Sequence, residues 1–449
     1  MHPLIYGLCV LLLWSCKDEE VKPSPQIQDV NAFIWEGMSE MYLWNDLMPQ
    51  DIDAKSEFDP KLYFEKLLFR PTDRWSFITD DYDGLINSLK GIETSFGHNF
   101  KLFLMPGSND VVGIVKYVVP NSPADLAGIH RGDKFFKVDG IKLTTSNYQE
   151  LLFERGSYTL TFGEFDAQGA ISPVEDKKLT AIELAENPIL IHKTLDVNGQ
   201  KIAYLSYNQF IQEYGDSLNT VFQQFKQDGV TDLVLDLRYN PGGSITTAIL
   251  LSSMIAPAAV VENKEVYARM VWNDHVTEYI VQEEGENSDN LVSTFVIPEV
   301  NLNLSKVYIL VSRNSASASE LVINCLKPYM EVILVGSENT TGKYVGSITL
   351  HDKEADNGWA MQPIVLKSAN ADGFTDFVDG FSPDFFVADD FDAELGTLEE
   401  DMLAKSIELI TGISVADPAR VASSTIPKNL KPIIDQRLAA RQNMYFDLN

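Results

Sequence analysis

Runs of apolar and polar residues divide the chain into three kinds of segment. From residue 29 to 90 the apolar residues recur at the three- and four-residue spacing of amphipathic helices. From 91 to 170 the apolar runs are short, rich in β-branched residues and separated by Gly and Asn turns, which is typical of strands. From 185 to 412 apolar strands alternate with amphipathic helices, and near the end of this segment the pattern predicts a strand over 359–367 and a helix over 395–410. The pattern predicts a multi-domain α/β protein with a small helical N-terminal domain, a β-rich domain and an α/β domain.

The α/β domain contains a strand–helix–strand unit with serines at its first turn. Residues 307–312 are apolar and β-branched, which predicts a strand. The periodicity predicts a helix over 318–329 and a second strand over 331–335. This second strand leads into a glycine-flanked loop that ends at Lys343.

Ser317 stands where that helix begins, and two uses of its hydroxyl are open. The sequence Ser317-Ala-Ser-Glu320 fits a capping box, in which Ser317 satisfies an amide of the first turn and Glu320 reaches back. Alternatively the hydroxyl is a nucleophile, because the free amides and the positive dipole end of a helix suit a developing oxyanion. A nucleophile needs a base, so the choice depends on the candidate bases.

Lysine is the candidate base that the sequence offers. No histidine lies between His275 and His351, whereas Lys343 lies in the loop after the second strand of the unit. Burial can lower the pKa of a lysine toward neutrality, and the lysine can then accept a proton from serine. An exposed loop lysine is the ordinary alternative. His275 or His351 could serve in a Ser-His-Asp enzyme, although neither stands in a motif. The residues favour a Ser317/Lys343 pair.

The unit consists of SASASE, a helix, a strand and then G-x-x-x-T-x-G-K. In this order of motifs it resembles the carboxy-terminal processing (tail-specific) peptidases, which are Ser/Lys serine peptidases of the S41 type. The resemblance implies that Ser317 is the nucleophile, that Lys343 is the general base and that the Ala318 amide forms half of the oxyanion hole. The turn D-L-R-x-N-P-G-G matches the same family. It implies that the amide of Gly242 or Gly243 completes the hole.

Two departures from the family pattern concern the lysine. The loop that carries Lys343 is one residue longer than the usual form. Many members carry a glutamine four residues after the lysine, which orients it, and this chain has Ser347 there. The hydroxyl of Ser347 can still donate or accept a hydrogen bond, so Ser347 is a candidate for supporting the lysine.

Residues 121–140 carry the pattern S-P-A-x-x-A-G-I-x-x-G-D-x-x-x-x-V-D-G, which resembles a PDZ domain. The β-rich domain, residues 91–170, is therefore expected to be PDZ-like. PDZ domains bind an extended C-terminus as an added strand and hold its carboxylate on backbone amides. The carboxylate loop is expected near Ser95–His98. A domain that only regulates or spaces the catalytic domain is the alternative. The segment Asp73–Phe77 resembles one commonly found in this family just before the PDZ module; by composition alone it would only pack.

The N-terminal residues predict export and lipidation. Residues 4–14 form an apolar run too short to span a bilayer, as in the apolar region of a secretory signal. Residues 1–15 are thus expected to be a signal peptide. Cys16 stands where a bacterial lipoprotein cysteine is lipidated, and 16–28 would be a tether. The protein is expected to be an extracytoplasmic lipoprotein of the outer membrane or cell surface, with the periplasm as the alternative.

Composition limits the partners. The chain has 35 basic and 65 acidic residues and a formal charge of −30, which disfavours nucleic acid. No H-E-x-x-H motif or cysteine pair suggests a metal, and no cofactor is expected. Cys325 is expected to be a packed core thiol. Residues 413–449 are expected to form a short helical or flexible tail. The expected function is an endopeptidase on proteins or peptides, and the alternative is an inactive peptide-binding lipoprotein on the same scaffold.

Overall fold

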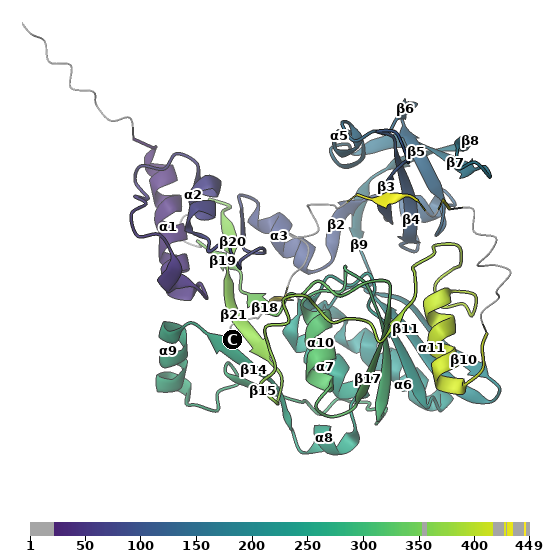
Figure 1. The fold of residues 1–449 in the computed structure, drawn as a ribbon. Coiled ribbons are helices and arrows are strands. Elements are labelled where there is room, and N and C mark those ends of the chain that lie inside the picture. Colours follow the sequence, from purple (N-terminus) through teal and green to yellow (C-terminus); the bar gives the residue numbers. More distant parts are fainter. Residues whose placement is uncertain (1–21, 353–356, 416–425, 428, 434–443, 446–449) are drawn as a thin grey trace, which may run out of the picture.

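The computed structural model describes residues 22–352, 357–415, 426–427, 429–433 and 444–445. Three parts are apparent in Figure 1: the N-terminal helices, a β-rich domain and a larger α/β domain. The predicted multi-domain α/β fold is thereby confirmed. The predicted signal peptide and Cys16 lie outside the described residues.

The N-terminal part is helical, as predicted. Each helix begins with a polar cap, and in two of the three a proline follows at the first position, where its missing N–H costs nothing. The elements are α1 Pro25–Met41, the 3₁₀ turn Asn45–Leu47, α2 Pro60–Leu67, β1 Phe77–Thr79 and α3 Tyr82–Leu89. The strand β1 pairs with β20 (Ala360–Gln362), so this part is joined to the α/β domain by a sheet.

The β-rich domain is a sheet in the order β23-β3-β4-β5-β7-β8, with β6 paired to β5. Its apolar residues form a separate core, because one face of each central strand points inward. Its elements are β3 His98–Leu104, β4 Val111–Val118, α4 Pro123–Leu126, β5 Lys134–Val138, β6 Ile141–Lys142, α5 Tyr148–Phe153, β7 Ser157–Phe165 and β8 Ile171–Thr180. The antiparallel pair β2 (Ile92–Ser95) and β9 (Ile182–Ala185) leads into and out of the domain.

The α/β domain is built on a sheet in the order β10-β11-β12-β16-β17-β22, of which all but β10 run parallel. Its strands are β10 Ile189–Val197, β11 Gln200–Tyr207, β12 Asp232–Asp236, β16 Lys306–Val311, β17 Glu331–Gly336 and β22 Phe385–Phe386. The inner strands are apolar on both faces because helices cover both faces. Val307 and Ile309 face the core that contains the α7 and α10 side chains, whereas Tyr308 and Leu310 face α11.

The helices of this domain follow the predicted alternation with strands. They are the 3₁₀ turn Gln212–Tyr214, α6 Gly215–Asp228, α7 Ile245–Ile255, α8 Ala258–Glu262, α9 Asp274–Glu284, α10 Ala318–Leu326 and α11 Asp401–Thr411. The helix predicted from residue 395 begins only at Asp401. Gly396 has a left-handed φ of 70°, and the Glu400 side chain caps the helix by accepting from the Met402 and Leu403 amides. Cys325 is fully buried in α10, as expected.

A second sheet, in the order β13-β24-β18-β21-β14-β15, lies beside the first. Its strands are β13 Gly243–Ser244, β24 Met444–Tyr445, β18 Val345–Ser347, β21 Ile364–Ala369, β14 Val266–Trp272 and β15 Val292–Thr294. The small strand β19 (Leu350–His351) pairs with β20. The single strand predicted over 359–367 is in fact β20 and β21, which belong to different sheets.

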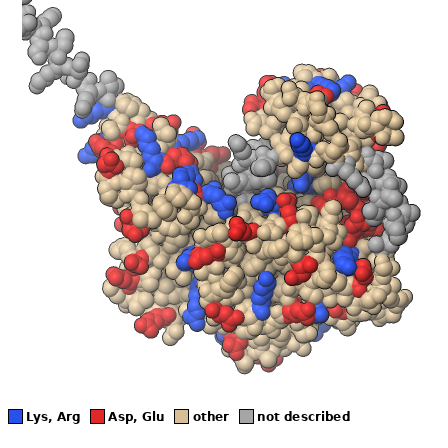
Figure 2. All heavy atoms as spheres, viewed as in Figure 1, with Lys and Arg blue, Asp and Glu red and all other residues tan. Residues whose placement is uncertain are grey.

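Within residues 413–449, for which a short helical or flexible tail is predicted, the described residues include two short strands. β23 (Lys431–Pro432) pairs with β3, and β24 pairs with β13 and β18. Sequence periodicity could not reveal two-residue strands, because each is defined by the edge on which it lies. Within the described part of the chain, every helix is too short or too polar to cross a membrane. On the face shown in Figure 2, acidic and basic side chains are interspersed.

Candidate active site

Ser317 lies in a strained turn between β16 and α10. Its backbone has φ 62° and ψ −115°, a conformation that non-glycine residues rarely adopt. The hydroxyl faces the first turn of α10 as in a capping box, but it makes no capping hydrogen bond. Among the described residues its Oγ, although buried, has no hydrogen-bond partner. A buried hydroxyl without a partner is uncommon in proteins, and capping does not explain this one.

The carboxylate of Glu320 joins the Ser317 turn to the lysine loop. One oxygen, Oε2, accepts hydrogen bonds from the Ser317 amide at 2.9 Å and from the Lys343 amide at 2.8 Å. The other, Oε1, accepts from the Gly342 amide at 2.7 Å and from Thr340 Oγ1 at 2.5 Å. Glu320 is fully buried, and burial raises its pKa. The sequence indicated only a capping role for Glu320, whereas it holds the two candidate catalytic residues together.

The Lys343 side chain is buried, with an exposed fraction of 1%, so the alternative of an exposed loop lysine is wrong. Burial lowers the pKa of Lys343 from its usual 10.5 to about 7, against the opposing effect of the Asp73 and Glu320 carboxylates. Near neutral pH a large fraction of Lys343 is therefore uncharged and able to accept a proton.

The segment that leads into β1 contributes to the surroundings of the lysine. Lys343 Nζ lies 5.9 Å from the centre of the Trp75 ring. Trp75 is held by Asp73, whose Oδ1 accepts from the amides of Trp75 and Ser76 at 2.9 Å, while Oδ2 accepts from the Tyr42 hydroxyl at 2.8 Å. The sequence suggested only packing for Asp73 and Trp75. The resemblance of residues 73–77 to a family segment was the signal available.

The two glycines of the turn after β12 have different surroundings. The Gly242 amide donates to Asn240 Oδ1 at 2.8 Å, so this amide is already used inside the turn. Gly243 has φ 136°, and a Cβ on it would lie 2.1 Å from the Phe210 carbonyl oxygen. Only glycine fits this approach, and its backbone is thereby held in place. Ala318, as the first residue of α10, has an N–H without a partner inside the helix.

A buried charge cluster fixes the start of this turn. Arg238 is fully buried and donates to Asp236 and to both carboxylate oxygens of Glu400, at 2.6 and 2.9 Å. A buried arginine that is fully hydrogen-bonded to carboxylates resists movement, since removal of one partner leaves an uncompensated charge. Ser319 Oγ adds a bond of 3.0 Å to the Asn240 carbonyl. The turn and the start of α10 therefore form one rigid unit.

The β-rich domain contacts the same turn through an arginine. Arg131 donates to the Tyr239 hydroxyl at 2.6 Å and to Asp389 Oδ1 at 2.5 Å. Tyr239 is the residue before Asn240, and its own hydroxyl donates to Asp389 at 2.5 Å. The expected carboxylate loop is the short turn between β2 and β3, where the Gly97 amide donates to Ser95 Oγ at 3.0 Å.

Ser347, the residue in place of the expected glutamine, lies in β18 and is buried. Its Oγ donates to Gln362 Oε1 at 3.5 Å, and the Gln362 side chain in turn donates to Thr349 at 3.0 Å. A glutamine from a different strand thus lies next to the position where the family pattern has one. No local sequence pattern selects Gln362.

The two rival histidines lie in other surroundings. His275 is exposed on α9. His351 stacks on the Tyr82 ring with centroids 3.8 Å apart, and its Nδ1 is 3.0 Å from the Trp359 carbonyl oxygen. Neither ring has a contact with Ser317 in the described part of the chain. Within the described ranges, no group of three His, Cys, Asp or Glu side chains could hold a metal ion.

Three segments of the chain match known families. Residues 201–387 match Peptidase family S41, residues 29–77 match the Peptidase S41 N-terminal domain, and residues 114–157 match a PDZ domain. These segments coincide with the α/β, helical and β-rich parts of the structure. The crystal structure of a putative S41 protease from Bacteroides fragilis NCTC 9343 is similar, with a TM-score of 0.71 and 28% sequence identity. The similarity covers 85% of this chain and 97% of that one.

Two curated relatives bear related names. The chain is 26% identical over 264 residues to carboxyl-terminal-processing peptidase 3, chloroplastic, of Arabidopsis thaliana, which covers 57% of this chain and 46% of that protein. It is 27% identical over 239 residues to the carboxyl-terminal-processing protease of a Picosynechococcus species. This match covers 52% of this chain and 52% of that protein. The chain spans about half the length of these relatives.

Proposed function

Since this chain belongs to peptidase family S41, we propose that it is a serine endopeptidase in which Ser317 is the nucleophile and Lys343 is the general base. The observation that carries the proposal is the shared hydrogen bonding of the two residues: one buried carboxylate oxygen of Glu320 accepts from both of their amides. Such a shared acceptor fixes the relative position of nucleophile and base before substrate arrives.

The chemistry follows the usual course of acyl transfer. Neutral Lys343 accepts the proton of the Ser317 hydroxyl as Oγ attacks the peptide carbonyl carbon. The resulting ammonium returns the proton to the leaving amine, and the peptide C–N bond breaks. Water, deprotonated by Lys343, then attacks the acyl carbon; the C–Oγ bond breaks, Lys343 returns the proton to Ser317 Oγ, and the second product is released as a carboxylic acid. Burial favours the neutral form of the lysine before each proton transfer.

The oxyanion is held by the amides of Ala318 and Gly243. Gly243 is the better choice of the two glycines because the Gly242 amide is bonded to Asn240. The start of α10 adds its positive dipole end to the stabilisation of the negative charge. Gln362, through Ser347, supports the strand that follows the lysine.

A Gly243→Ala variant is expected to lower kcat by about 100- to 1,000-fold, because the methyl group collides with the Phe210 carbonyl and displaces the amide. Steady-state hydrolysis of a peptide measures the effect. Gly229→Ala is the matched control: Gly229 also has a left-handed φ, of 75°, but a Cβ there meets nothing within 4 Å. Unchanged kcat in Gly243→Ala would contradict the assignment of this amide.

The substrates are extracytoplasmic proteins or peptides with unstructured C-terminal segments, captured by the PDZ-like domain. The names of the relatives and the match of residues 114–157 support this choice. Cys16 would anchor the protein to the outer membrane or cell surface by a lipid, which accords with the apolar run at residues 4–14.

The proposal is tested with the protein that begins at residue 17, given unfolded casein and a peptide with an unstructured C-terminus. New N-termini are counted over time, and a Ser317→Ala preparation serves as the blank for contaminating proteases. Turnover above the blank supports the endopeptidase. Binding of the peptide without turnover would replace it by a peptide-binding lipoprotein on the same scaffold.

The pH dependence of kcat/KM tests the role of the lysine. The base must be unprotonated, and its pKa is about 7. We therefore expect kcat/KM to rise about tenfold per pH unit below pH 6 and to level off above pH 8. A profile that is flat between pH 5 and 8 would exclude a base with this pKa.

A further inference from the structure

The strand β24 lies in the middle of the site. The second sheet has the order β13-β24-β18, so Met444–Tyr445 is inserted between two strands that both belong to the proposed catalytic apparatus. On one side Met444 pairs with Gly243 and Tyr445 with Ser244. On the other side Tyr445 pairs with Ser347, four residues after the lysine.

A substrate would need this same slot. An extended peptide is held in a protease by strand pairing, and its scissile carbonyl must reach the amide that stabilises the oxyanion. Gly243 supplies that amide in the proposed function, and Met444 is the residue paired with Gly243. The backbone of Met444–Tyr445 therefore lies where the backbone of a substrate would lie.

The Tyr445 side chain belongs to an apolar cluster next to this slot. Only 8% of Tyr445 is exposed, and its ring packs with Leu85 and Leu89 of α3 and with Ala360 of β20. The other members of this cluster come from elements other than β13 and β18. A large apolar or aromatic side chain is the kind of residue that would pack on it.

The upstream part of the same segment lies on the β-rich domain. Lys431 pairs with Leu104 and Pro432 with Phe103, and the Ile433 amide donates to the Leu102 carbonyl at 2.9 Å. β23 is thus an added antiparallel strand on β3, the edge of the PDZ-like sheet (Figure 1). This is the way in which PDZ domains accept extended peptides.

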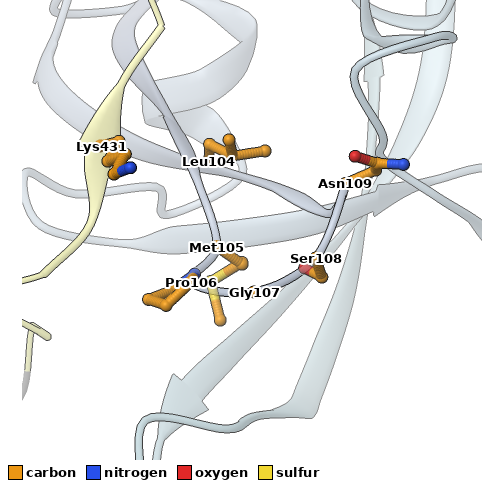
Figure 3. A pocket seen from close by; sticks show the side chains of 7 residues that line it. All are labelled: Leu104, Met105, Pro106, Gly107, Ser108, Asn109 and Lys431. Atoms are coloured by element: carbon orange, nitrogen blue, oxygen red, sulfur yellow. The ribbon is translucent and has the colours of Figure 1, made fainter.

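Side chains of this segment also pack on the domain. Leu430 contacts the cluster of Val112, Phe136 and Phe165, and Ile433 contacts the main core of the β-rich domain. Lys431 borders a cavity of about 280 Å³ against the β3–β4 turn (Figure 3), which none of the proposed catalytic residues lines. The segment is thus held at two places, the sheet edge that captures peptides and the slot at Gly243.

We propose that residues 429–433 and 444–445 are a tethered occupant of the substrate path, which incoming substrates must displace. The inference rests on the proposed function, because the slot is a substrate slot only if Gly243 and Lys343 act as assigned there. It also identifies the substrate class: an extended peptide with a large apolar or aromatic side chain that packs on Leu85, Leu89 and Ala360 in place of Tyr445.

The test compares the protein from residue 17 with a form that ends at Asn443. A fluorescein-labelled peptide of residues 440–449 is titrated into both in the Ser317→Ala background, so that no turnover is needed. Removal of the tether is expected to tighten peptide binding by about tenfold or more, because an intramolecular competitor acts at a high effective concentration. In the catalytically intact pair, KM for casein is expected to fall by a similar factor.

Point variants of the full chain give a reading that does not depend on truncation. Tyr445→Ala is expected to tighten binding of the labelled peptide severalfold, while Tyr445→Phe, which keeps the ring, is expected to leave it unchanged. If no form turns over casein but the truncated form binds the peptide more tightly, the endopeptidase fails and the tethered occupant stands. If truncation weakens peptide binding, or removes turnover that added peptide restores, β24 is a framework strand and the inference is overturned.

Discussion

A Ser317→Ala variant is expected to fold like the parent protein and to hydrolyse casein at least about 10,000-fold more slowly. The hydroxyl oxygen is the only heavy atom removed. Loss of a serine nucleophile typically lowers kcat by this factor or more. Its Oγ has no hydrogen-bond partner among the described residues, so its removal leaves no buried group unsatisfied. The melting temperature is therefore expected to stay within about 2 °C of that of the parent.

Ser315→Ala is the matched control, and it is expected to show the opposite behaviour. Ser315 Oγ donates to the Leu237 carbonyl at 2.8 Å and accepts from the Ser312 amide at 3.0 Å. Its removal should lower the free energy of unfolding by about 1–3 kcal/mol while turnover stays within tenfold of the parent. Retained turnover in Ser317→Ala would show that the nucleophile is misassigned. A loss of stability as large as that of Ser315→Ala would show the same.

A Lys343→Met variant is expected to lose turnover by roughly 1,000- to 10,000-fold and to gain stability near neutral pH. The folded protein keeps the lysine neutral above pH 7, whereas a lysine in the unfolded chain stays charged up to about 10.5. The unfolded chain thus binds more protons between these values, and the free energy of unfolding of the parent rises with pH across that window. Methionine has no charge to lose on folding, so the free-energy cost of burying a neutral lysine disappears. The melting temperature should therefore rise by about 5 °C at pH 7.

The gain in stability should shrink as the pH approaches 10, because the free-energy cost of deprotonating the lysine on folding then falls in the parent protein. Lys327→Met is the matched control. Lys327 is also partly buried, with Nζ 4.6 Å from the centre of the Phe381 ring, and burial lowers its pKa too. It lies outside the site and should leave kcat unchanged. Retained turnover in Lys343→Met would eliminate the lysine as base and direct attention to His275 and His351.

The sequence predicted the fold where burial imposes a strong pattern. The strands at 306–311 and 331–336 and the helix from Ala318 were predicted within one to three residues, because an inner parallel strand is apolar on both faces and a covering helix on one. The start of α11 was predicted six residues too early, since apolar residues at 395 and 398 continue the helical spacing. The left-handed Gly396 and the salt bridge of Glu400 to Arg238 decide the true start, and the partner is 162 residues away.

The chemistry of the site was partly visible in the sequence. Ser317 and Lys343 stand in motifs, but the residues that act on them come from distant segments. Trp75 lies above the lysine and Gln362 beside Ser347, and no local pattern relates these pairs. The role of Glu320 was hidden for another reason: the capping box explains it locally, whereas three of its four donors lie more than 19 residues along the chain.

The shared carboxylate of Glu320 also determines when activity can arise during folding. The Ser317 turn and the lysine loop are parts of one chain separated by α10 and β17, and only the finished packing of both elements brings their amides to the same oxygen. Before that moment the carboxylate is hydrated, the lysine is charged and the serine turn is free to relax from its strained conformation. A newly made or partly unfolded molecule therefore contains the proposed catalytic residues but cannot act on a peptide. Unfolded copies cannot cut one another, because the proposed nucleophile and base come together only in the native structure.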